Sequence, residues 1–425
     1  MYQMGYVMNG LLLGYMSDRF GRRPTLWLAM TIEVCGGLSL IFSPTITMYI
    51  MSRFFVGLGD SGRGVSLYLL ILETVGTKYR SDIVMTVTFG WITGYIALPG
   101  AAWILKDYQL LQAIPTTVTF VLMCTWLLTI PESPRWQLSN NQHEKARVTI
   151  IKAAKLNGHV TNVDYINDQL DQLRHNSEVN LNKHKKRKHY TIVDLLSSKV
   201  MRNYTLIFWF SFAVNAFIYH GISLNVQQIG GNLYVNFAIA GLVEIPSLIL
   251  NIVGLKYVGR KTFTVATMAM ASLSYLAIVL CSAYRESMGV HYNTAKLIMA
   301  MFGKLFIFSS FNVIYIHAGE IFPTVLRHTG IGSCSIAARI GSILAPFVRE
   351  MSEHYNFVIS MMVFGLLALM ATLLTLFLPE TKDRDIPDNI MDVEELHDLS
   401  GSNSADSDNI TYAISTNIIK ETDNI

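Results

Sequence analysis

Long apolar segments alternate with short polar connections along most of the chain. Eleven of these segments approach the length of about 17–25 residues that a helix needs to cross a bilayer. The first is short, because the chain opens inside it. The pattern predicts an all-α membrane protein with about eleven transmembrane helices. The segments lie near residues 1–16, 25–43, 46–71, 83–105, 109–130, 204–224, 233–255, 262–284, 293–316, 328–349 and 356–378.

Charge is concentrated in alternate connections, and this predicts the orientation. The cationic connections are those at 18–23, 78–80, 183–188, 256–261 and 327–328. Because Lys and Arg accumulate on the cytoplasmic side of membrane proteins, the N-terminus is expected outside and the C-terminal tail inside. We therefore expect a multi-pass protein of the plasma membrane with a cytoplasmic C-terminus.

The same pattern divides the chain into four parts. Residues 1–130 form an N-terminal half and residues 204–378 a C-terminal half. Between them, 131–203 is expected to be a cytoplasmic loop with short amphipathic helices at 142–156 and 163–177 and a basic run, Lys183–His189. That run either attracts anionic lipid headgroups or is simply solvated. The acidic tail, 379–425, is expected to be disordered.

Composition narrows the function class. The chain is 51% hydrophobic and 15% charged, with 33 Lys and Arg against 30 Asp and Glu, so nothing indicates nucleic-acid binding. Gly57-x-Gly59-x-x-Gly62-x-Gly64 matches a dinucleotide fingerprint, but no strand precedes it. Small residues at helical spacing predict close helix packing instead. The sequence contains no other catalytic, nucleotide or metal motif, so we expect no enzyme and no cofactor; a coupling ion is left open.

An internal repeat is present. Glu73-x6-Arg80 recurs as Glu320-x6-Arg327. A Pro-Glu-Ser/Thr motif follows each glutamate at nearly the same distance, at 131–133 and at 379–381. A duplicated unit is typical of transporters whose two halves rock about a central site. Five spans in the first half against six in the second predict that a piece before Met1 is missing.

Several motifs carry a family resemblance. Gly14-x-x-x-Asp18-Arg19-x-Gly21-Arg22-Arg23 resembles the signature loop of the major facilitator superfamily. The motifs at 131–136 and 379–382 are shared with sugar porters. The segments at 219–225, 243–246 and 320–330 resemble the organic cation, anion and carnitine transporter family of the solute carriers. This resemblance covers nearly everything from Met1 to Lys382.

The resemblance implies a major facilitator fold with two pseudo-symmetric helical halves. It also implies a first helix and a large ectodomain ahead of this chain's first span, so the chain is expected to be an N-terminally truncated member. Transport by alternating access would then be gated by cytoplasmic charges. By resemblance, this conformational gate comprises Asp18, Arg19, Arg22, Arg23, Glu73, Arg80, Glu132, Arg135, Glu320 and Arg327.

Ionisable residues at bilayer depth cost about 2.5–3.5 kcal/mol each, so each one needs a reason. Asp60 and Arg63 lie three residues apart and are expected to form a structural pair. Glu33 is expected to face a neighbouring helix. Lys304 is placed near the outer end of its span, from which its side chain would snorkel to the interface.

Glu244 and Arg339 are the candidate substrate-binding charges, both expected at mid-span. A buried structural ion pair between them remains an alternative. In the resembled family, a carboxylate at the first position is associated with cation and carnitine transporters, and an arginine at the second with anion and carnitine transporters. A zwitterion would satisfy both charges. Tyr219, Phe212 and Trp91 are the aromatic candidates for cation–π contact.

The sequence thus predicts a transporter of small organic ions, with a carnitine-like zwitterion or an organic cation as the best substrate. One alternative is a facilitator like the sugar porters. Another is a truncated fragment that does not transport and regulates a full-length partner. The expected partners are the small organic ion and membrane lipid, in a monomer or loose oligomer without nucleic acid.

Overall fold

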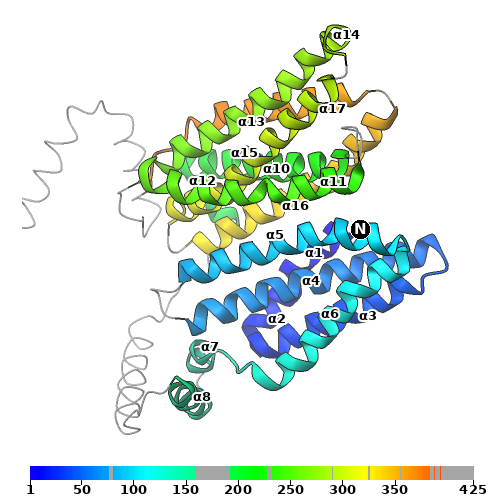
Figure 1. The fold of residues 1–425 in the computed structure, drawn as a ribbon. Helices are drawn as coiled ribbons and strands as arrows, with labels where there is room; N and C mark the ends of the chain where they lie inside the picture. The colour runs from blue at the N-terminus through cyan, green and yellow to red at the C-terminus, as the bar shows by residue number, and fades with distance from the viewer. Residues whose placement is uncertain are drawn as a thin grey trace, which may run out of the picture. The chain divides into compact units, whose positions relative to one another are not determined.

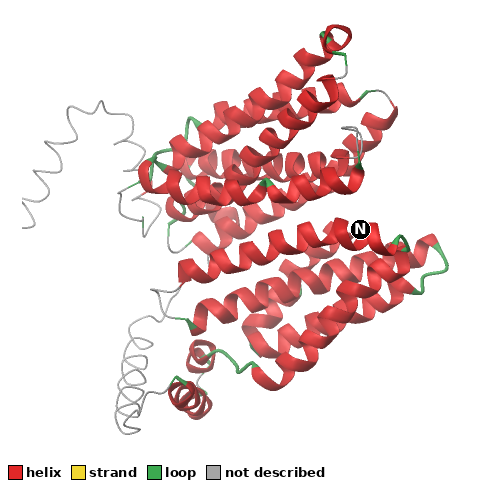
Figure 2. Cartoon of the chain, in the orientation of Figure 1, coloured by secondary structure: helices red, strands yellow, loops and turns green. Residues whose placement is uncertain are grey.

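The computed structural model describes the backbone of residues 1–75, 80–140, 142–157, 192–226, 232–289, 291–323, 326–354 and 356–382, with 387 and 393. Every element in these ranges is a helix (Figures 1 and 2). The chain divides into two compact units, Met1–His189 and Tyr190–Ile425. The basic run and most of the acidic tail lie outside the described residues, as does the expected helix at 163–177.

The N-terminal unit contains eight described helices. They are α1 Tyr2–Leu11, α2 Leu13–Phe20, α3 Arg22–Ile41, α4 Ile46–Thr74, α5 Arg80–Leu105, α6 Tyr108–Thr129, α7 Pro134–Ser139 and α8 His143–Leu156. The last confirms the expected helix at 142–156. The backbone N–H of Leu12, between α1 and α2, still bonds to the Met8 carbonyl, so the expected span at 1–16 is present as two short helices in near continuity.

The C-terminal unit begins with the short 3-10 helix η2 Ile192–Leu196. Its α-helices are α10 Lys199–Asn225, α11 Leu233–Leu242, α12 Glu244–Tyr257, α13 Arg260–Ala283, α14 Arg285–Met288, α15 His291–Ile321, α16 Arg327–His354 and α17 Phe357–Thr375. Helices α11 and α12 form one span, interrupted at Val243. Pro246 explains this break, because a proline lacks the N–H that would bond back to residue 242.

Ten helices of the described ranges are long and apolar enough to cross a membrane. They account for ten of the eleven predicted segments. The eleventh, at 1–16, is not among them and consists of the two short helices α1 and α2. Many large apolar side chains of the ten spanning helices are exposed, such as Phe302 and Leu373, as expected for surfaces that face lipid.

Glycines bring the helices of the N-terminal unit together, as predicted for the 57–64 motif. Helix α4 packs against α1 and α3. A Cβ on Gly57 would lie 2.2 Å from the Tyr2 carbonyl oxygen, and one on Gly59 would lie 2.5 Å from the Glu33 nitrogen. Only hydrogen fits at these contacts, so both glycines are packing positions. A Cβ on Gly64 would meet open space.

The core of the C-terminal unit lies where α10 packs against α15 and α16. Phe208, Phe212, Ile314 and Phe322 are fully buried there. Helix α13 packs against α15 and α17 beside it (Figure 1). Helix α10 is therefore surrounded, and its side chains at the level of residues 212–220 lie inside the unit.

Candidate functional site

Charged side chains cap a helix at the predicted cytoplasmic end of the N-terminal unit. The carboxylate of Glu132 accepts the backbone N–H groups of Arg22 (3.0 Å) and Arg23 (3.1 Å), which open α3. The Arg22 guanidinium bonds to Asp18 (2.8 Å) and Glu73 (3.0 Å). A carboxylate at a helix N-terminus satisfies free N–H groups and complements the helix dipole. This cluster therefore fastens α2, α4 and the 131–133 motif to the start of α3.

The C-terminal unit repeats this arrangement. The carboxylate of Glu380 accepts the backbone N–H groups of Lys261 (3.3 Å) and Thr262 (3.2 Å) at the start of α13. Arg260 bonds to Glu320 (3.1 Å), as Arg22 bonds to Glu73. Thr381 donates to Glu320 at 2.5 Å. The repeat found in the sequence thus corresponds to the same capping chemistry in both units.

The backbone donors act on the ionisation of Glu380. Burial alone would raise the pKa of this carboxyl. The backbone N–H groups of Thr262, Lys382, Lys261 and Thr381 stabilise its ionised form and lower the pKa below the ordinary glutamate value. A side chain next to either cap would displace the capping carboxylate, since a Cβ on Gly21 would lie 2.4 Å from a Glu132 oxygen and one on Gly259 would lie 2.0 Å from a Glu380 oxygen.

Among the described side chains, those of Arg19, Arg23, Arg135 and Arg327 do not bond to the acidic groups of these clusters in this conformation. Arg19 bonds to Tyr15 one turn away on its own helix (3.1 Å). Arg135 is exposed, and Arg327 donates to the Phe322 carbonyl (3.3 Å). Arg23 contributes its backbone N–H, while its side chain bonds to the Leu127 carbonyl (2.9 Å). The side chain of Arg80 lies outside the described side chains.

At membrane depth in the C-terminal unit, Glu244 pairs with Lys304. The Lys304 Nζ lies 3.0 Å from Glu244 Oε1, and both side chains are 0% exposed. The ammonium also donates to the Ala240 carbonyl (2.7 Å), a group near the break between α11 and α12. The expectation that Lys304 snorkels is wrong. Instead, the Glu244 carboxylate and the Ala240 carbonyl bind its ammonium inside the unit.

Tyr219 belongs to the same cluster. Its hydroxyl donates to Glu244 Oε1 (2.9 Å), and its ring lies 5.5 Å from the Lys304 ammonium. Both Glu244 contacts use one carboxylate oxygen. The other, Oε2, is buried and has no hydrogen-bond partner among the described residues. In the polar triad of Glu244, Lys304 and Tyr219, one carboxylate oxygen of Glu244 therefore accepts both contacts and the other accepts none.

Arg339, on α16, lies close enough to His220 of α10 and Tyr315 of α15 to interact with both electrostatically. His220 directly follows Tyr219, the residue of α10 that bonds to Glu244. His220 also contacts the Ser342 hydroxyl (3.2 Å) one turn beyond Arg339 on α16. The Arg339 side chain is half-buried. Because Lys304 is the cation beside Glu244, the alternative of a Glu244–Arg339 ion pair is not what the structure shows.

The aromatic candidates separate into different environments. Tyr219 is part of the triad, whereas Phe212 is fully buried, with its ring 4.6 Å from that of Tyr315. Phe212 therefore packs under the residue that Arg339 approaches and exposes no face for a substrate in this conformation. Trp91, on α5 of the other unit, is 56% exposed.

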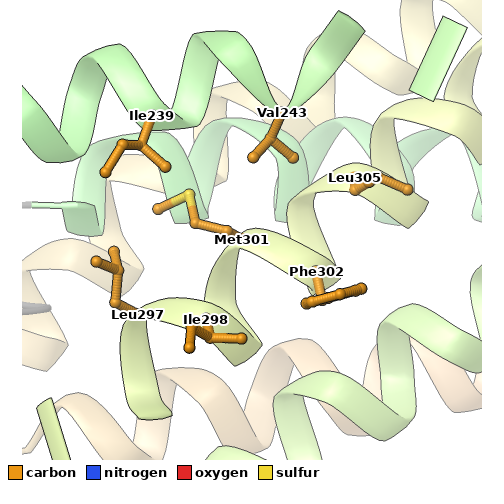
Figure 3. Close-up of a pocket in the computed structure, with 7 residues that line it drawn as sticks. All are labelled: Ile239, Val243, Leu297, Ile298, Met301, Phe302 and Leu305. Atoms are coloured by element: carbon orange, nitrogen blue, oxygen red, sulfur yellow. The ribbon is translucent and has the colours of Figure 1, made fainter. Parts of the chain in front are cut away.

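An apolar groove of about 320 Å³ lies between α11 and α15. In Figure 3, Ile239 of α11 and Val243, the residue that follows α11, face Leu297 and Met301 of α15. Its seven lining residues are all apolar, so it offers no group for a substrate charge. Val243 directly precedes Glu244, and the groove therefore lies beside the triad without reaching its polar atoms.

Comparison with known proteins agrees with this architecture. The sequence profile of the family described as "Sugar (and other) transporter" matches residues 1–388. An organic cation transporter protein of Drosophila melanogaster is 34% identical over 397 residues, which cover 93% of this chain and 70% of that protein. Human organic anion transporter 3 is 30% identical over 393 residues, covering 92% and 70%.

The fold also matches a solved structure, the proton:xylose symporter XylE bound to a bromo-deoxyglucose. The TM-score is 0.64 at 18% identity, with 94% of this chain and 87% of XylE covered. At this identity the match supports the fold only. The membrane spans, the family match and the relatives agree, and they identify a membrane transporter family, not an enzyme family. The chain belongs to the sugar (and other) transporter family of the major facilitator superfamily, and it is a multi-pass membrane protein similar to the organic cation and anion transporters of the solute carriers.

Proposed function

We propose that the chain transports organic ions that carry a carboxylate, and that Arg339 binds this group. The observation that carries the proposal is the Lys304–Glu244 ion pair. At mid-span the described C-terminal unit has two cations, Lys304 and Arg339, and one carboxylate, Glu244. The pair cancels the carboxylate, so this region has a net positive charge, which favours an anionic group.

The guanidinium of Arg339 suits this role. Arginine presents parallel N–H donors that match the two oxygens of a carboxylate. His220, Tyr315 and Ser342 lie around it and offer further polar contacts. In this proposal Tyr219 positions Glu244 and Lys304 and does not contact the substrate carboxylate itself.

A carnitine-like zwitterion remains the second candidate, because Glu244 Oε2 is buried without a hydrogen-bond partner among the described residues. A quaternary ammonium near that oxygen would compensate it while Arg339 holds the carboxylate. A purely cationic substrate is less favoured, since it would meet the net positive charge. The sugar-porter alternative gives no role to these charges, and the relatives at 30–34% identity are named for organic ions.

The test is uptake of three labelled probes by cells that express the chain: benzoate, carnitine and tetraethylammonium. Arg339→Ala should abolish uptake of benzoate and carnitine. Arg349→Ala is the matched control, an arginine on the same helix that pairs with Glu353 and is 40% exposed. Uptake of tetraethylammonium alone, or benzoate uptake that survives Arg339→Ala, would refute the proposal.

The regulatory alternative makes a different prediction. A fragment that only regulates a full-length partner transports none of the probes and changes the uptake of a co-expressed relative. Surface labelling of each variant separates loss of transport from loss of delivery to the membrane. By the positive-inside argument, we also propose that the C-terminus is cytoplasmic. We further propose that the membrane is the plasma membrane.

A further inference from the structure

A second charged cluster lies at membrane depth in the N-terminal unit. The Arg63 guanidinium of α4 donates from Nε to Glu33 Oε2 of α3 (2.7 Å) and also to Asp60 on its own helix. The three side chains are between 12% and 26% exposed. Glu33 lies near the middle of α3, and Asp60 and Arg63 lie near the middle of α4. The pair predicted from the sequence is therefore part of a triad.

Neutral donors complete this triad. The hydroxyls of Tyr2 (2.6 Å) and Tyr6, both on α1, donate to Asp60 Oδ2. The Thr119 hydroxyl of α6 donates to Glu33 Oε1 (3.1 Å). Four helices thus meet at the triad, and each contributes a polar side chain.

The charges do not balance. Two carboxylates share one guanidinium, and α1 and α6 contribute no charged side chain. The other charged groups of α2, α3 and α4 are engaged elsewhere: Asp18, Arg22 and Glu73 bond to one another, Arg19 bonds to Tyr15, Arg23 bonds to Leu127, and Arg53 bonds to Tyr49. If both carboxyls are ionised, the triad has one excess negative charge at bilayer depth. Uncompensated charges at this depth cost several kcal/mol, and a carboxyl group can avoid that cost by binding a proton.

The hydrogen bonds indicate which carboxyl takes the proton. Among the described residues, Asp60 accepts one hydrogen bond each from Tyr2, Tyr6 and Arg63, whereas Glu33 accepts two from Arg63, at 2.7 and 3.5 Å, and one from Thr119. Each carboxylate thus accepts three bonds, but the bond of 3.5 Å to Glu33 is long and weak, so the ionised form of Asp60 is the better stabilised. Glu33 is also the less exposed of the two, at 12% against 22%. Both differences favour an ionised Asp60 and a protonated Glu33.

We propose that Glu33 is a proton-binding site and that the proton it carries is the coupling ion of this transporter. A proton from water forms an O–H bond on a Glu33 oxygen, and Arg63 then keeps Asp60 as its sole ionic partner. Release of the proton to water restores the Arg63–Glu33 ion pair. Since that pair joins α4 to α3, proton binding weakens one tie between the two helices. Coupling ions act in this way, by changing the relative stability of two conformations.

The direct test is infrared difference spectroscopy of the purified chain in liposomes, titrated from about pH 5 to 9. Ordinary Asp and Glu carboxyls are already ionised throughout this range, so they contribute little to the difference spectrum. We expect a protonated carboxylic C=O band that Glu33→Gln removes. Glu33→Asp should keep the band, and the exposed Glu353→Gln serves as the matched control, with the band unchanged. Absence of the band in the parent chain, or a band that survives Glu33→Gln and disappears in Asp60→Asn, would overturn the inference.

Uptake provides the second readout. Uptake of whichever of the three probes the chain transports should depend on pH in the parent chain, and this dependence should be lost in Glu33→Gln. A parent chain with pH-independent uptake, or a Glu33→Gln variant with an unchanged pH profile, would overturn the coupling role. The infrared band is measured without any substrate, so failure of the carboxylate proposal leaves this test intact, and the two failures are distinguishable.

Discussion

The buried Lys304–Glu244 pair allows a quantitative prediction for the C-terminal unit. We consider Lys304→Met, Glu244→Gln and the double variant. At 3.0 Å, two unit charges attract by about 5–6 kcal/mol with an effective dielectric constant of about 20. The desolvation of both ions opposes this attraction and reduces the net contribution of the pair to a small value.

Each single substitution has a larger effect than the pair's net contribution. Lys304→Met leaves an anion, and Glu244→Gln leaves a cation, in a place where both side chains are 0% exposed. Removing one partner of a buried pair costs about 3–5 kcal/mol, because the remaining charge is uncompensated. The double variant removes both charges and fills the same volume, so its stability should lie much closer to that of the parent chain.

The assay is a double-mutant cycle on the detergent-solubilised protein, read as the thermal stability of the folded fraction. Since each single variant loses about 3–5 kcal/mol and the double variant loses little, the coupling free energy should approach about 6–10 kcal/mol, with the double variant more stable than either single one. Lys296→Met is the control, a lysine on the same helix that lies over the rings of Tyr292 and Phe357. If the losses of the two single variants add in the double variant, the ion pair is not what holds these residues, and the argument for a net positive site fails.

Three further predictions use other contacts. Gly59→Ala should destabilise the chain by about 1–3 kcal/mol, because its Cβ would lie 2.5 Å from the Glu33 nitrogen, whereas Gly64→Ala, with open space, should be neutral or stabilising in the same thermal assay. Glu380→Gln should lower stability at neutral pH. Since the pKa of Glu380 is lowered in the folded state, its contribution is present above the unfolded pKa and is lost as pH falls below about 4, where variant and parent should converge in a melting series. Tyr219→Phe should cost about 1.5–3 kcal/mol, because it removes a 2.9 Å hydrogen bond to a charged, buried Glu244; equal stability of variant and parent would contradict this.

The fold and the caps were predictable because local patterns determine them. Apolar length defines the spans, and the repeat pointed to Glu132 and Glu380 without identifying what they bind. The structure adds that both carboxylates bond to backbone N–H groups at a helix start. No proline lies near the break at Leu12, so the sequence predicted the first segment as one helix.

The partners of the membrane-depth charges were not predictable from the sequence. Glu244 and Lys304 are sixty residues apart in the sequence, and Glu33 and Arg63 are thirty apart. Sequence spacing shows which residues share a helix face, but not which faces of distant helices meet. The one signal for Lys304 was the free-energy cost of a charge in an apolar span. The prediction that this side chain snorkels was wrong because the sequence does not show that Glu244 of α12 lies beside it.

The two units therefore differ in a way that the repeat does not suggest. Where charges cap helices, the units are alike, since Arg22–Glu73 corresponds to Arg260–Glu320. At membrane depth they have opposite excess charge: two carboxylates with one guanidinium in the N-terminal unit, and two cations with one carboxylate in the C-terminal unit. A capping charge has the same structural task in both copies, so the two copies keep it. A charge at depth is costly in either copy, and it is tolerable only where it binds something. The opposite signs are what a transporter needs if one unit binds a proton and the other binds the negative group of an organic ion.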